Sequence, residues 1–226
     1  MKTTRYEDFK FAIGNREIDP AHVRFLKRKI TKDGYHGGNI IVSRDMSIID
    51  GQHRFIACKE LGIPVPYEID PNATIETARD LNSSQKPWVG KTYMNSYADT
   101  GNENYIRLRK FIKNTGTQYR YALKALRPDL PGKETVAKDG KLIITDEHVQ
   151  QATKIAAFWN RFKILCHGGG DTFNSFRDAT LILWHSPEVD MEYLATKLEK
   201  HGLNPFHGLE GCMRELGVIY NFKSRA

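Results

Sequence analysis

Cysteine is scarce in this sequence, and its three cysteines, Cys58, Cys166 and Cys212, lie far apart. An odd and scattered set of this kind indicates neither a disulfide framework nor a zinc site. No apolar run approaches the roughly 18–20 residues that span a bilayer, and the opening segment lacks the apolar core of a signal peptide. We therefore expect a cytoplasmic protein with no membrane partner.

Several catalytic signatures are also missing from the sequence. It has no G-x-S-x-G nucleophile elbow and no pair of histidines at the spacing of a metal-binding helix. The glycine run that ends at Gly170 is followed by Asp171 rather than by the Lys-Ser/Thr of a phosphate-binding P-loop. Acidic residues do not cluster as they do in a two-metal nuclease centre. We expect no metal site.

The size and net charge of the chain indicate what it can form and which partners it attracts. With 226 residues, 40% of them hydrophobic, it can bury a core without disulfides. Its formal net charge is +7. An excess of positive charge attracts polyanions through long-range, salt-dependent forces, so nucleic acid is a natural partner class.

The stretch from Ile48 to Gly62 has the clearest local organisation. Its first residues are typical of the end of a strand, and Asp50-Gly51 forms a turn pair in which glycine accepts a positive φ. A helix is expected from Gln52, because the apolar residues that follow recur at helical spacing. Gly62 fits the left-handed position that ends such a helix.

A strand, a glycine turn and a helix together favour an anion. The first helical turn has backbone N–H groups without partners inside the helix, and it carries partial positive charge. Arg54 could add a bidentate clamp, and His53 could donate a hydrogen bond or titrate near neutral pH. The sequence thus predicts a phosphate site at Gly51, Gln52, His53 and Arg54. The alternative is an ordinary surface helix with two polar residues in its first turn.

The same loop carries a family resemblance. Asp50-Gly-Gln-His-Arg-Phe-Ile-Ala57, with Glu60-Leu61-Gly62 behind it, resembles the signature of the ParB/sulfiredoxin superfamily, in the branch with a literal Asp-Gly-Gln-His-Arg. The segment Asn15–Pro20 resembles the Arg-containing opening of ParB N-terminal domains. The resemblance covers roughly residues 8–90 and implies a small mixed-sheet α/β domain.

The resemblance also has consequences for chemistry. Gln52 stands where partition ParB proteins have an acidic residue and where sulfiredoxins have their catalytic cysteine. Sulfinic-acid reduction is therefore not expected, and nucleotide hydrolysis should be slow or absent. The cofactor that the family implies is a nucleoside triphosphate with Mg²⁺. By the same resemblance Asn82 and Gln85 are candidate nucleotide-pocket residues, and the nearby Trp88 could stack on a base.

Elements outside the loop follow from local patterns. We expect a helix over about 21–32 with Asp19 as its N-cap. Strands are expected at 39–43, 47–49 and 65–69, and a further helix at 74–81. The cations on the first of these helices are typical of a solvated face. The alternation predicts an α/β domain over residues 1–95, followed by an all-α domain over 96–226.

The segment from Tyr105 to Arg127 has seven Lys or Arg residues and no Asp or Glu. Two helical stretches flank Gly116-Thr117, an arrangement that resembles a helix-turn-helix, which ParB proteins carry after the signature domain. The candidate DNA-binding residues are Arg107, Arg109, Lys110, Lys113, Gln118, Arg120 and Lys124. The alternative is a basic helical hairpin packed within the fold.

These observations favour a ParB-like, DNA-associated protein of a phage, plasmid or similar mobile element, with a phosphate or nucleotide pocket. Two alternatives remain open at this stage. One is an enzyme, either a nucleotide phosphohydrolase or a ParB-like nuclease. The other is a protein-interaction module that has kept the fold without catalysis. A homodimer is compatible with all three.

Overall fold

The computed structural model describes residues 1–81, 88–167 and 170–222, and it divides the chain into two compact units. The first unit contains Met1–Arg109 and Glu134–Leu142, and the second contains Lys110–Lys133 and the chain from Ile143 on. Asn82 and Gln85 lie outside the described residues. Within the described ranges, no helix is both long and apolar enough to cross a membrane.

The first unit is built on a five-stranded mixed sheet with the order β1-β5-β3-β4-β2. Its β3 pairs antiparallel with β4 and parallel with β5, while β4 and β2 are parallel and β5 and β1 antiparallel. The expected mixed α/β sheet is thus present, and its likeness to ParB stays a prediction. The strands are β1 (Lys2–Thr3), β2 (Lys10–Phe11), β3 (Ile40–Val42), β4 (Ser47–Asp50) and β5 (Val65–Ile69).

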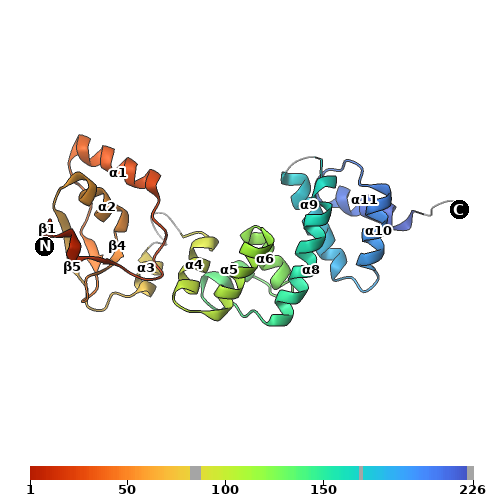
Figure 1. Ribbon diagram of the computed structural model, residues 1–226, viewed down its shortest axis with the longest axis horizontal. Coiled ribbons are helices and arrows are strands. Elements are labelled where there is room, and N and C mark those ends of the chain that lie inside the picture. Colours follow the sequence, from red (N-terminus) through yellow and green to blue (C-terminus); the bar gives the residue numbers. More distant parts are fainter. Residues whose placement is uncertain (82–87, 168–169, 223–226) are drawn as a thin grey trace. The chain divides into compact units, whose positions relative to one another are not determined.

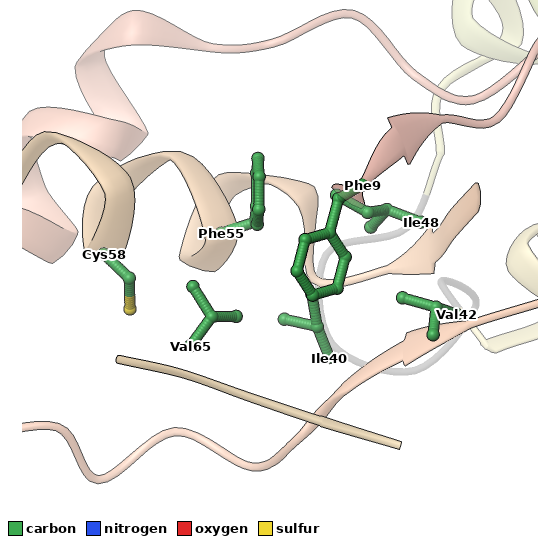
Figure 2. Packing of buried hydrophobic residues seen from close by; sticks show 7 residues of the cluster. All are labelled: Phe9, Ile40, Val42, Ile48, Phe55, Cys58 and Val65. Carbon is green, nitrogen blue, oxygen red and sulfur yellow. The ribbon is translucent and has the colours of Figure 1, made fainter. Parts of the chain in front are cut away.

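The two faces of this sheet are covered by different helices, because successive strand residues point to opposite sides. Ile40 and Ile48 belong to the core cluster that also contains Phe55 of α2 (Gln52–Leu61), and Figure 2 shows this packing. On the other face, Ile49 packs with Ala78 of α3 (Ile75–Leu81). Both faces are therefore buried, and β4 is packed on each side where it leads into the turn at Gly51.

Helix α1 (Pro20–Asp33) lies against α2 (Figure 1). The side chain of Asp19 accepts hydrogen bonds from the backbone N–H groups of Ala21 and His22, so its predicted role as N-cap is confirmed. Val23 is buried on the inner side of the helix. This inner side fixes which residues of α1 face outward.

The remaining elements of the described residues are helices and short 3-10 turns. Helix α4 (Gly90–Asp99), the start of α5 (Glu103–Thr115) and α7 (Lys133–Lys138) belong to the first unit. The second unit packs around Trp159, whose indole Nε1–H donates to Thr180 Oγ1 at 2.9 Å. Its helices besides the end of α5 are α6 (Tyr119–Leu126), α8 (Asp146–Phe162), α9 (Gly170–Trp184), α10 (Met191–His201) and α11 (Gly208–Asn221). Short 3-10 turns occupy Tyr6–Asp8 and Lys163–Leu165.

Candidate functional site

The turn between β4 and α2 requires glycine. Gly51 has φ +88°, a left-handed conformation that L side chains rarely adopt. A Cβ at this position would lie 2.6 Å from Cγ2 of Ile40 and 2.9 Å from Nη2 of Arg54. The sheet and the Arg54 guanidinium therefore approach the backbone more closely than any side chain would allow.

Arg54 has partners inside the first unit. Its Nη2 donates to Oδ2 of Asp50 at 2.8 Å, and its Nη1 donates to the carbonyl oxygen of Gly38 at 2.6 Å. These charge-assisted bonds tie the loop before β3 to the start of α2. The guanidinium that the sequence assigned to a phosphate clamp thus has a structural role, and phosphate binding by Arg54 stays a prediction.

Gln52 and His53 are both buried, with 4% of each residue exposed. Nε2 of Gln52 donates to the carbonyl oxygen of Arg16 at 2.6 Å, and the backbone N–H of Asp19 donates to Nε2 of His53 at 2.9 Å. A backbone N–H needs a lone pair, so this nitrogen of His53 is unprotonated and the ring is neutral. The first turn of α2 therefore holds the Arg16–Asp19 segment in place.

This arrangement forms one wall of a cavity of about 240 Å³. The segment before α1 supplies that wall, the start of α4 supplies another, and Nδ2 of Asn95 donates to Oε1 of Glu17 at 3.2 Å. Of the described residues predicted to bind phosphate, His53 lines the cavity, and Gly51, Gln52 and Arg54 are not among its lining residues. The lining residues are Arg16, Glu17, Asp19, His22, His53, Trp88, Val89, Lys91, Thr92 and Asn95.

Trp88 is the most unusual residue of this cavity. It is only 4% exposed, and no described residue accepts a hydrogen bond from its indole Nε1–H. Its ring packs edge-on against Tyr93, with the centroids 5.3 Å apart. A buried donor without an acceptor costs about 1–3 kcal/mol.

Charged side chains of both signs line the cavity, which suits a ligand with both anionic oxygens and hydrogen-bond donors. Burial lowers the pKa of Arg16, while the carboxylates of Asp50 and Asp19 oppose that shift. Arg16 remains a cation, and its Nη2 lies 3.5 Å from Nδ1 of His53. Lys91 adds a second positive charge, and Glu17 offers a carboxylate on the same lining. Two cations and a carboxylate acceptor therefore line one space.

Sequence reasoning named some of these residues for other reasons and missed others, Lys91 among them. Arg16 lies in the segment that resembles a ParB opening, and Trp88 was a candidate stacking residue. Lys91 carries no local signal, because only the folding of α4 against the Arg16 segment brings it to the cavity. Among the described residues no group of three or more His, Cys, Asp or Glu is placed to hold a metal ion.

The basic segment from Tyr105 to Arg127 looks different in three dimensions. Nη1 of Arg109 lies 2.5 Å from the carboxylate of Asp99, and Nζ of Lys124 lies 2.5 Å from the carboxylate of Asp178. Arg127, which ends the segment, pairs with Asp129 at 2.9 Å. Acids outside the segment therefore oppose three of its seven cations.

Helix α6, the expected recognition helix, has little free surface. Tyr121, Leu123 and Leu126 are all 3% exposed or less, and the helix packs against α8. The predicted residues that remain exposed are Lys110, Lys113, Gln118 and Arg120, while Arg107 is half-buried. DNA binding through this segment stays a prediction.

Comparison with known proteins adds no family assignment: no family model matches the chain, and no curated protein or solved structure is significantly similar to it.

Proposed function

We propose that this chain is a DNA-associated protein whose first unit binds a phosphate-bearing ligand, a nucleotide, in the cavity beside Arg16. One observation carries the proposal. Two cationic residues, Arg16, which is half-buried, and Lys91, line the same space together with Trp88. Both Arg16 and Lys91 are cations and hydrogen-bond donors, so they suit a ligand that offers anionic acceptor oxygens.

The remaining lining residues indicate how such a ligand would lie. Arg16 and Lys91 are the groups that would bind phosphate oxygens. Glu17 can accept a hydrogen bond from a ribose hydroxyl or a base amino group. A volume of about 240 Å³ is slightly below the usual range for small-molecule pockets, about 300–1,000 Å³. It therefore suits one part of a nucleotide better than a ligand that is wholly enclosed.

The assignment to DNA-associated proteins of mobile elements rests on the resemblance of the Asp50–Ala57 loop to ParB-like proteins. The net charge of +7 supports a polyanionic partner independently of that resemblance. A nucleoside triphosphate with Mg²⁺ is the ligand that the resemblance implies. The cavity side chains described above suit its phosphates and sugar.

Hydrolysis of the nucleotide is expected to be slow or absent. Gln52 has no basic group, and its amide donates to the carbonyl oxygen of Arg16. The lone pair on Nε2 of His53 already accepts the N–H of Asp19. A general base needs a lone pair within reach of the water that it deprotonates. Metal-dependent phosphate release that disappears in His53→Ala would favour the hydrolase alternative.

Ligand binding can be tested through Trp88, because the two other tryptophans, Trp159 and Trp184, belong to the second unit. Titration with ATP, CTP and GTP, each with and without Mg²⁺, should change the fluorescence of the wild-type protein. Trp88→Phe should lose most of this change. Calorimetry on Arg16→Ala should show binding weakened by about 1.5–3 kcal/mol, the scale of a charged hydrogen bond.

Arg54→Ala is the matched comparison, since it removes the same type of side chain at a position that is not among the lining residues. We expect it to lower the free energy of unfolding, because Asp50 and Gly38 lose a partner. At temperatures where both are folded, an affinity close to that of the wild type would assign phosphate binding to Arg16, and a weaker affinity would bear out the sequence prediction that Arg54 binds phosphate. Equal affinities of wild type and Arg16→Ala would show that the cavity is not the ligand site.

A further inference from the structure

The outward side of α1 is a second, distinct surface. Its exposed residues Arg24, Phe25, Arg28, Lys29 and Lys32 form what we call the α1 basic face. Phe25, Arg28, Lys29 and Lys32 follow the i, i+3, i+4, i+7 spacing that places residues on one side of a helix. The inner side contains Val23, which is buried. All five side chains therefore point away from the core of the first unit.

The cations of this face lack ion-pair partners among the residues that the structure describes. In the described part of the chain none of Arg24, Arg28, Lys29 and Lys32 forms a salt bridge, and Asp33 is the one acidic residue within α1. Lys27 differs from them, because it is half-buried and lies 2.8 Å from a carboxylate oxygen of Glu60. The four exposed charges thus create an uncompensated positive field.

We propose that the α1 basic face docks on the phosphate backbone of double-stranded DNA. This inference rests on the proposed association with DNA and names its surface. Arg24, Arg28 and Lys32 are four residues apart, so their attachment points are spaced by about 6 Å along the helix. Neighbouring phosphates on one strand are separated by a similar distance. A row of cations at this spacing can contact consecutive phosphates.

Phe25 adds an apolar group to the same face. It is 51% exposed, and its ring stacks on His22, with the centroids 6.2 Å apart and the planes at 17°. His22 in turn lines the cavity of the proposed nucleotide site. On such a face the cations can contact phosphate oxygens, and the exposed aromatic ring can pack against a sugar. The DNA surface and the nucleotide cavity therefore share one helix.

The inference is tested with two triple variants of the full chain in fluorescence anisotropy with a short DNA duplex. One variant, Arg24→Gln/Arg28→Gln/Lys32→Gln, removes charge from the α1 basic face. The control, Lys110→Gln/Lys113→Gln/Arg120→Gln, removes exposed charge from the α5–α6 segment. Each changes the net charge by three, from +7 to +4. A general loss of electrostatic attraction would therefore affect both equally.

We expect the α1 variant to bind at least about tenfold more weakly at low salt than the wild type. The slope of log affinity against log salt should fall by about 0.9 for each lost phosphate contact, and so by about 2.7 for three. The control should keep a slope near that of the wild type if α1 makes the phosphate contacts, and it should lose slope if the α5–α6 segment binds DNA as the sequence predicted. Lys27→Gln should also bind like the wild type, since Glu60 already neutralises that cation.

The outcomes separate the inference from the function on which it rests. A wild-type protein that does not bind the duplex at low salt overturns both. A wild-type protein that binds, with an α1 variant that binds equally well or a control that loses as much, overturns the inference alone. Binding of the wild type to vesicles of anionic phospholipid, but not to the duplex, also overturns it. Circular dichroism melts of the variants show that each is folded.

Discussion

Helix α1 and the α5–α6 segment are both rich in Lys and Arg, yet the fold treats their charges in opposite ways. In the α5–α6 segment Arg109 and Lys124 meet the carboxylates of Asp99 and Asp178. On α1 only Lys27 has such a partner among the residues described. The density of cations along a sequence therefore does not tell which of them are available to a partner.

The difference arises from where the acids lie in the chain. No acid occurs between Tyr105 and Arg127, but Asp178 is 54 residues beyond Lys124 and still meets it. Local sequence cannot show such a pairing. Helix α1 contains an acid, Asp33, so its sequence is less purely basic than that of the segment from Tyr105 to Arg127. The comparison teaches that a charge run has to be read together with everything that packs against it.

The largest effect is expected where a cation of α6 is structural. Asp178→Asn removes the charge that faces Lys124 and weakens the acceptor for the hydroxyl of Tyr121, 3.4 Å away. We expect a loss of about 1.5–3 kcal/mol in the free energy of unfolding, the scale for hydrogen bonds to charged groups. Urea denaturation of the full chain measures it. A loss below about 0.5 kcal/mol, typical of neutral surface changes, would place Lys124 among the available cations.

A smaller effect is expected at Arg109. Its side chain and that of Asp99 are each 41% exposed, and exposed ion pairs contribute about 0–1 kcal/mol. Asp99→Asn should therefore cost at most about 1 kcal/mol, and high salt should reduce the difference. A larger, salt-independent loss would mean that the pair is as structural as Lys124 and Asp178, which would sharpen the contrast with α1.

The pairing of Arg127 with Asp129 should make the free energy of unfolding depend on pH. Its hydrogen bond to Asp129, and then its charge, lower the pKa of that carboxyl from 3.8 to about 2. A depressed folded pKa contributes stability that is present above the unfolded value and is lost as pH falls through the folded one. Stability should therefore decline as the pH falls from about 4 to about 2, less steeply in Asp129→Asn. The effect is small, because the carboxylate is 59% exposed.

The smallest stability effects are expected on α1. The triple charge variant of the α1 basic face should change the free energy of unfolding by less than about 0.5 kcal/mol, because its three side chains are exposed. Urea denaturation again provides the measurement. A substantial loss from the charge variant would break the comparison, since its cations would then have structural partners too.

Local patterns predicted much of the first unit. The cap at Asp19, the glycine turn at Gly51 and the strand Val65–Ile69 each depend on a few neighbouring residues, and all three are present. Helix α4 was missed, because it starts at Gly90 after Val89 and has no capping side chain. Because α4 was not predicted, the residues that it contributes to the cavity were not predicted either.

The candidate site was predicted less well than the fold, for a physical reason. The loop Gly51–Arg54 was found, but the direction of each side chain depends on groups far away in sequence. Nε2 of His53 meets the backbone of Asp19, 34 residues earlier, and Gln52 meets the carbonyl of Arg16. Such contacts decide that Arg16, rather than Arg54, faces the cavity, and no periodicity or motif records them.

The path of the chain between the two units has a consequence for biosynthesis. The chain leaves the first unit after Arg109, returns at Glu134 and leaves again after Leu142. The returning part is bonded into the first unit, since the hydroxyl of Tyr105 donates to the carbonyl oxygen of Ala137 at 2.7 Å. A ribosome adds about 5–20 residues each second. The first unit must therefore wait a few seconds, until α7 and Leu142 have emerged, before it can close, and a fragment that stops at residue 109 would leave that closure unfinished.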